Sequence, residues 1–168
     1  MTMSDINALD HDAFLARVGP VFEHSPWIAQ RAWAARPFDG VAGLHQAMMA
    51  VVAAASADEQ VALLQAHPDL AGKAARAGSL TADSTREQAG AGLDRLSDTE
   101  YDRFDRLNRA YRERFGFPFI VAVKRHTKES ILAACEARLG NDRATEIGTA
   151  LAEVGLITRL RLDALFGD

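Results

Sequence analysis

The chain has 168 residues, of which 48% are hydrophobic and 25% charged, so it can bury a sizeable core and is not a disordered tail. Its formal net charge of −4 gives no reason to expect nucleic acid or an anionic membrane as a partner. No apolar run reaches the ~20 residues of a membrane span, and the acidic N-terminus lacks a signal-peptide pattern, so the cytoplasm is the expected location.

Helix-start signals recur along almost the whole chain. Ser56 with Glu59, and Ser97 with Glu100, each form a capping box before an apolar-periodic run. Further start signals are Ser25-Pro26, Asp39, Thr127 and Asn141 or Asp142, and stop signals are Pro37, Gly116 and Gly140. We therefore predict an all-α fold: a single-domain helical bundle of roughly eight helices spanning residues 1–168.

One stretch, FGFPFIVAV at residues 115–123, is aromatic, β-branched and apolar, as a strand would be. Pro118 argues against a central strand, and no second strand is available to pair with it. We predict an extended, buried connection instead. Its main-chain N–H and C=O groups need partners, which either side chains of neighbouring helices or a small polar ligand would supply.

His67 stands directly before Pro68 in the stretch LLQAHPDLAGK. A residue that precedes proline is pushed out of the α region, so the preceding helix should end near Ala66 and leave His67 at a bend. Two interpretations stay open: a histidine that caps the helix or fills the surface, and one held at the bend for chemistry. The sequence does not predict a metal site. The other histidines (His11, His24, His45 and His126) lack the spacing of metal ligands, and the single Cys135 falls on an apolar stripe.

The stretch DSTREQAGAGL, residues 83–93, is also unusual. Ser84 and Glu87 fit a capping box, so helix initiation alone can explain both residues. The QAGAGL that follows is a poor helix former, and its small residues would let a ligand or another backbone come close. These residues alone favour neither interpretation.

Arg161 lies on the apolar stripe of the last helix, four residues from Ile157 and four from Leu165. A guanidinium on a buried face needs an anionic partner or a hydrogen-bonded network. A structural salt bridge and a substrate contact would both meet this need. Its neighbour Arg159 stands four residues before Asp163, which predicts a solvated ion pair.

Four motifs together resemble those of the 2-oxo-4-hydroxy-4-carboxy-5-ureidoimidazoline (OHCU) decarboxylase family. They are AHPDLAGK, STREQAGAGL, FGFPFI and EVGLITRLRL, and they follow the family's order with similar gaps from about residue 10 to the end. Each motif alone is a weak signal, whereas the first two at this spacing are a strong one.

The resemblance implies a cofactor-free, all-helical enzyme of urate breakdown that converts OHCU to (S)-allantoin and CO₂, uses no metal and is often a homodimer. For the chemistry that this implies, our hypothesis is that His67 transfers the proton, because an imidazole is suited to proton transfer near neutral pH, and that Glu87 assists by orienting His67 or by handling the second proton. The substrate contacts that the resemblance implies are Pro68, Ser84, Thr85, Arg86, Glu87, Gln88, Phe119, Ile120, Val121, Ala122, Val123 and Arg161. We therefore expect positions 67, 87 and 161 to face one shared hollow.

Two functions of other classes compete with this one. The tripeptide His67-Pro68-Asp69 also occurs in J-domain co-chaperones, which contact a chaperone through it. Their preceding helix is basic, whereas SADEQVALLQA contains two acidic residues and no Lys or Arg, and this chain is far longer than that module. The other competitor is a non-catalytic helical scaffold in which Arg161 and Glu87 pair structurally.

Overall fold

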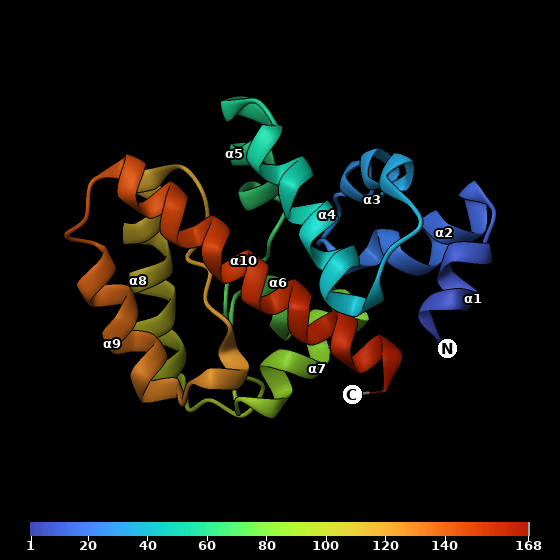
Figure 1. The fold of residues 1–168 in the computed structure, drawn as a ribbon. Helices are drawn as coiled ribbons and strands as arrows, with labels where there is room; N and C mark the ends of the chain where they lie inside the picture. Colours follow the sequence, from blue (N-terminus) through green and yellow to red (C-terminus); the bar gives the residue numbers. More distant parts are fainter. Residues whose placement is uncertain (168) are drawn as a thin grey trace. The chain divides into compact units, whose positions relative to one another are not determined.

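The computed structural model of the protein describes residues 1–167; Asp168, the last residue of the predicted domain, lies outside the described residues. Within residues 1–167 the chain forms ten α-helices and three short 3₁₀ helices and no strand, which confirms the predicted all-α class (Figure 1). The prediction of roughly eight helices is low because very short helices, such as the four-residue α6, carry no clear periodic signal. The α-helices are α1 (Met3–Ala8), α2 (His11–Val18), α3 (Trp27–Ala32), α4 (Gly40–Ala54), α5 (Ala57–Gln65), α6 (Lys73–Arg76), α7 (Ala82–Gly90), α8 (Asp98–Phe115), α9 (Lys128–Arg138) and α10 (Arg143–Phe166), and the 3₁₀ helices are η1 (Gly19–Val21), η2 (Trp33–Ala35) and η3 (Val123–Arg125).

The helices divide between two compact units. The first unit contains the chain from Met1 to Ala66 and again from Gly155 onward, and the second contains His67 to Val154. The long helix α10 therefore contributes residues to both units. That the whole chain forms one domain stays a prediction.

In the first unit, α3 packs against both α2 and α4 (Figure 1). Phe14 of α2 is fully buried, with its ring centroid 5.2 Å from that of Trp33 and 6.0 Å from that of Phe38. None of the described helices is by itself long and apolar enough to cross a membrane; only α4 and α5 taken together meet that test, and the chain bends by 119° between them.

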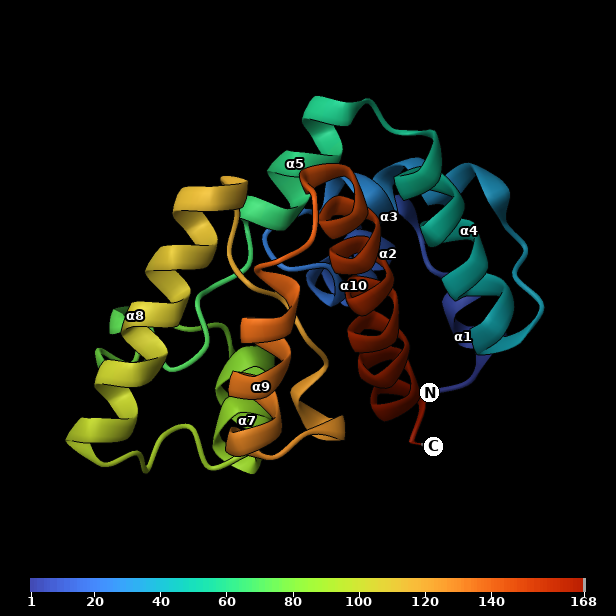
Figure 2. The ribbon, with the colours of Figure 1, turned by 90° about the vertical axis from the view of Figure 1, so that its left-hand side faces the viewer.

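In the second unit, α8 and α9 lie side by side (Figure 2). Four buried aromatic rings, those of Tyr111, Phe115, Phe117 and Phe119, form a cluster with centroid separations from 4.6 to 6.2 Å. Gly116 ends α8 in the left-handed region, at φ 83°, as its position predicted. The chain then leaves the helix inside the aromatic cluster, so the segment after Gly116 starts its path buried.

The predicted capping boxes are confirmed at the starts of α5 and α8, where Ser56 pairs with Glu59 and Ser97 with Glu100. Two other predicted caps are wrong in detail. Pro26 is the N-cap residue of α3, and the Ser25 hydroxyl instead donates to the carbonyl of Glu23. Asp39 precedes α4 but makes no side-chain cap hydrogen bond.

Candidate active site

His67 lies at the predicted bend of the chain. Helix α5 ends at Gln65, with Ala66 as its C-cap residue, which confirms the stop predicted from Pro68. The side chain of His67 is not on the surface: the residue is only 6% exposed, and its Nε2 atom is buried. The interpretation of His67 as a surface-filling residue is therefore wrong.

The loop that follows His67 has an unusual backbone. Ala71 adopts φ 53°, a left-handed conformation that costs a residue with a Cβ about 1–2 kcal/mol. A Cβ added at Gly72 would lie 2.9 Å from the Cβ of Asp69, so only glycine fits the tight turn there. A strained loop of this kind persists only where the surrounding structure over-determines it.

Gln88 of α7 supplies part of that support. Its Oε1 accepts a hydrogen bond from the N–H of Ala71 at 2.9 Å, and its Nε2 donates to the carbonyl of Asp69 at 3.3 Å. Gln88 is 4% exposed, so both contacts are shielded from water. The amide predicted to contact substrate thus holds the loop that carries His67.

Two residues of α8 complete the support, and the sequence prediction missed both. Asn108 is 6% exposed and donates from Nδ2 to the carbonyl of Leu70 at 2.8 Å. Arg112 donates from Nε to Oδ1 of Asp69 at 3.0 Å. A signal for Asn108 was present, because it is a polar residue next to the apolar face that Phe104 and Tyr111 mark.

Helix α7 starts earlier than its sequence predicted. Thr81 is the N-cap residue, and its hydroxyl accepts from the N–H of Ser84 at 3.3 Å. The predicted capping box of Ser84 and Glu87 is therefore wrong, since both residues lie inside the helix. Ser84 is 5% exposed and Glu87 is half-buried. Helix initiation no longer explains why a serine and a glutamate stand at these positions.

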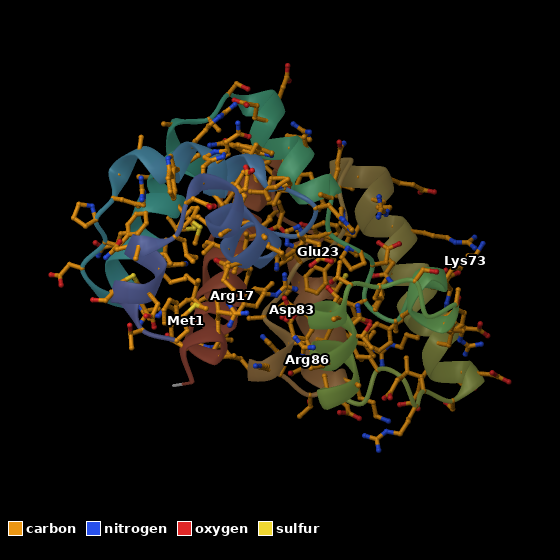
Figure 3. The ribbon with its side chains drawn as sticks, turned by 90° about the vertical axis from the view of Figure 1, so that its right-hand side faces the viewer. Met1, Arg17, Glu23, Lys73, Asp83 and Arg86 are labelled. Carbon is orange, nitrogen blue, oxygen red and sulfur yellow. The ribbon has the colours of Figure 1, made fainter. Side chains whose placement is uncertain are left out.

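Two predicted substrate contacts on α7 face away from the buried side of the helix. Thr85 is exposed, and its hydroxyl donates to the carbonyl of Thr81 at 2.8 Å. Arg86 is also exposed and forms an ion pair with Asp83 on the same helix (Figure 3). Each of these side chains has its hydrogen bond within α7 itself, so neither resembles a group held ready for a ligand.

The segment before η3 is extended, as predicted (Figures 1 and 2). Every residue from Phe117 to Val123 is buried. The carbonyl of Ile120 accepts from Nη1 of Arg138 at 2.7 Å, and the N–H of Ala122 donates to Oε2 of Glu153 at 3.1 Å. Side chains of neighbouring helices therefore supply some of its partners. Within the described residues, the main-chain groups of Phe119 and Val121 make no hydrogen bond to the protein.

Val123 differs from the rest of the predicted contact stretch. It is the first residue of η3, and its carbonyl accepts from the N–H of His126 at 3.0 Å. The extended backbone therefore ends at Ala122. Only the residues up to Ala122 could bind a ligand in the way that a neighbouring strand is bound.

Arg161 belongs to the first unit and is 8% exposed. Its Nη1 donates to Oε2 of Glu23 at 2.9 Å and to the carbonyl of Val21 at 3.2 Å. The structural salt bridge that its sequence position allowed is confirmed, with Glu23 as a partner that sequence reasoning missed. The surface pair Arg159–Asp163 is also confirmed, at 2.9 Å.

Two of the hollows that border predicted site residues in the second unit are large enough for a small ligand. One of about 400 Å³ is lined in part by Thr85 and Gln88, and another of about 350 Å³ in part by Pro68. Neither hollow has His67 or Glu87 in its wall, so we do not take either as the reactive pocket. Over the described residues, no group of three or more His, Cys, Asp and Glu side chains could hold a metal ion. Burial raises the pKa of Cys135 to about 12, so its thiol stays protonated.

Comparison with known proteins identifies the family of this chain. The sequence model of the family described as OHCU decarboxylase matches residues 7–163, which include parts of both units. The chain belongs to the OHCU decarboxylase family. Members of this family are carboxy-lyases, and the resemblance read from the four motifs is confirmed.

The similarity to individual members of the OHCU decarboxylase family extends over the whole chain. The chain is 46% identical over 168 residues to 2-oxo-4-hydroxy-4-carboxy-5-ureidoimidazoline decarboxylase of Haloferax volcanii, covering 100% of this chain and 98% of that protein. A crystal structure of (S)-allantoin synthase matches with a TM-score of 0.76 at 31% identity, over 98% of this chain and 53% of that one. A crystal structure of OHCU decarboxylase in the presence of (S)-allantoin shares the fold, with a TM-score of 0.71 at 19% identity over 95% of this chain and 100% of that one.

Because the chain belongs to the OHCU decarboxylase family, the tripeptide His67-Pro68-Asp69 no longer indicates contact with a chaperone. In this chain the aspartate of the tripeptide, Asp69, is tied to Arg112 and Gln88 inside the same unit. Asp69 therefore helps to shape the His67 loop and is not a free binding determinant.

We expect Asn108→Ala to lower kcat by roughly 10- to 100-fold, because a small misplacement of a reacting group is costly. The substitution leaves the buried carbonyl of Leu70 without the amide that now binds it, at about 1–3 kcal/mol in stability. Steady-state kinetics and thermal unfolding of the same preparation measure both effects. A loss of stability with an unchanged kcat would show that Asn108 supports the fold but not His67.

Proposed function

We propose that this member of the OHCU decarboxylase family converts OHCU to (S)-allantoin and CO₂, with His67 as the group that transfers protons. The observation that carries the proposal is a buried imidazole next to a loop that Gln88, Asn108 and Arg112 hold. An imidazole is suited to proton transfer near neutral pH. A fixed position allows it to act on one face of a substrate.

The chemistry needs proton transfer more than it needs a cofactor. The electron pair of the C–CO₂ bond moves toward the neighbouring carbon–nitrogen double bond, and the ring nitrogen takes up a proton as CO₂ leaves. The hydroxyl group then gives up its proton to become a carbonyl, and the adjacent carbon takes a proton on one face. The reaction consumes one proton overall, and the last protonation fixes the (S) configuration.

Substrate binding is assigned to groups of several kinds. Ser84 and Gln88 carry donors and acceptors that suit amide and ureido groups, although Gln88 also holds the loop. The main chains of Phe119 and Val121 offer N–H and C=O groups to the ring edge, whereas Ile120, whose carbonyl Arg138 binds, comes to this proposal from the family resemblance. Pro68 fixes the backbone at His67. Thr85, Arg86, Ala122 and Val123 come to this proposal from the family resemblance alone.

Arg161 is proposed to bind ring or ureido oxygens of the substrate and not its carboxylate. A strong pair between a guanidinium and the carboxylate would stabilise the ground state and slow the loss of CO₂. The buried carboxylate of Glu23 already balances the charge of Arg161, which weakens its attraction for a second carboxylate. A planar guanidinium carries five N–H donors, a geometry that suits neutral ring and ureido oxygens.

The proposed function is tested by supplying freshly generated OHCU and following the chirality of the allantoin by circular dichroism. We expect the protein to give (S)-allantoin much faster than the spontaneous decay, which gives a racemate. Spontaneous kinetics and a racemic product in the presence of folded protein would refute the proposal. A cytoplasmic location and a homodimer are further parts of it, and light scattering of the purified protein tests the second.

Glu87 is proposed to orient His67 or to handle the second proton, and Glu87→Gln should lower kcat by about 10²–10⁴-fold. Stability should change little, because Thr81 caps α7 in place of the predicted Ser84–Glu87 box. Thr81→Ala is the matched control, which should cost about 1 kcal/mol of stability and leave kcat unchanged. The reverse pattern, with Glu87→Gln unstable but active, would assign Glu87 to the helix alone.

A further inference from the structure

A buried ionic network contacts the extended segment that precedes η3 in the second unit. None of the residues of this network belongs to the predicted site. Glu146, in the first turn of α10, is 0% exposed. Its Oε1 accepts from the Tyr111 hydroxyl at 2.5 Å and from Nε of Arg138 at 2.8 Å, and its Oε2 accepts from Nδ2 of Asn141 at 2.9 Å. Burial, and then the hydrogen bond to Glu146, raise the pKa of Tyr111 above its ordinary value, so its hydroxyl stays a donor.

Such a network needs a reason, because burying a charged pair costs several kcal/mol per ion and packed apolar residues are often as stable. The geometry of Arg138 suggests one. While Nε binds Glu146, Nη1 reaches the carbonyl of Ile120 at 2.7 Å, and the guanidinium lies 4.6 Å from the ring centroid of Phe119. The network therefore ends on the segment from Phe119 to Ala122.

The positions of the two bound main-chain groups, the carbonyl of Ile120 and the N–H of Ala122, decide which edge of the segment is held. In an extended chain, the N–H and C=O of one residue point to the same edge, and successive residues alternate between edges. Ile120 and Ala122, which bind Arg138 and Glu153, are two residues apart and so share an edge. Phe119 and Val121 present their N–H and C=O groups along the opposite edge.

We infer that Arg138, fixed by Glu146 and Tyr111, is a positioning residue that together with Glu153 holds one edge of residues 119–122 so that the main chain of Val121 is presented to substrate. The inference rests on the proposed function, in which this backbone binds the ring of OHCU. Arg138 touches no substrate and acts on the segment through the carbonyl of Ile120 and the ring of Phe119.

Arg138→Lys tests the inference, because lysine keeps the positive charge beside Glu146 but lacks the fork that binds a carboxylate and a carbonyl at once. Arg143→Lys is the matched control: Arg143 also donates to a main-chain carbonyl, that of Phe115 at 3.1 Å, which lies outside the contact stretch. We expect Arg138→Lys to raise KM and the Kd for (S)-allantoin about tenfold with kcat within about twofold, as for loss of binding shared by ground and transition states.

If the role of Arg138 were purely structural, Arg138→Lys and Arg143→Lys would both have a lower melting temperature and an unchanged KM and Kd. That result would overturn the inference. Should Arg138→Lys fail to fold, Glu153→Ala releases the same edge at Ala122 from a half-buried side chain and must raise KM in the same way. A wild-type protein that leaves the decay of OHCU unchanged would overturn the proposed function and this inference with it. An active wild type with a normal Arg138→Lys variant would overturn the inference alone.

Discussion

His67→Ala should lower the rate of (S)-allantoin formation by about 10²–10⁴-fold, the usual contribution of a positioned acid or base. The loop next to His67 is held through its main chain, by Gln88 at Ala71 and by Asn108 at Leu70, and both contacts remain in the variant. The loop should therefore keep its shape in the variant. We expect kcat to fall far more than KM changes, and the residual allantoin to be racemic.

A second histidine of the same unit provides the control for this result. His126 bonds through Nδ1 to the Ser130 hydroxyl at 2.9 Å at the start of α9, and no step of the reaction is assigned to it. His126→Ala should retain the wild-type rate and the (S) product. A folded His67→Ala protein that keeps more than a small fraction of the stereospecific rate would show that the proton transfer belongs to another group.

Glu146→Gln should cause the largest loss of stability among single charge changes in the second unit, about 3–5 kcal/mol. The substitution removes the negative charge of the fully buried Glu146 and leaves the largely buried guanidinium of Arg138 uncompensated. Urea unfolding, followed by circular dichroism of the helices, gives the change in the free energy of unfolding.

A surface ion pair with the same nitrogen–oxygen distance is the control that distinguishes the effect of burial from the effect of ion pairing. Arg103 and Glu136 join α8 to α9 with a nitrogen–oxygen distance of 2.8 Å, equal to that of Arg138 and Glu146, but both side chains are about half exposed. Glu136→Gln should therefore cost less than about 1 kcal/mol. Equal losses for the two substitutions would mean that the Glu146 network carries no special weight in the fold.

Local signals predicted the helix ends well. The stop before Pro68, the left-handed Gly116 and the box of Ser97 with Glu100 all depend on residues within one turn of each other, and each is confirmed. The box assigned to Ser84 and Glu87 is wrong for an equally local reason. Thr81 stands three residues before Ser84 and caps the helix one turn earlier.

The partners of the site residues could not be predicted in this way. Glu23 lies 138 positions from Arg161, and Asn108 lies 38 positions from Leu70, so no periodic pattern links the members of either pair. In the sequence, nothing distinguishes Arg138 from any other basic residue in the last turn of a helix. Its contact with the carbonyl of Ile120 depends on how α9, α10 and the extended segment pack, which single-sequence patterns do not encode.

His67 and the main chain of Val121 are proposed to bind the same substrate molecule. A crystal structure of the protein with (S)-allantoin tests this proposal most directly. The account predicts that the ligand lies within hydrogen-bonding distance of the His67 imidazole and of the main chain of Val121. A ligand bound with full occupancy elsewhere, with the His67 ring contacting only protein atoms, would contradict the account.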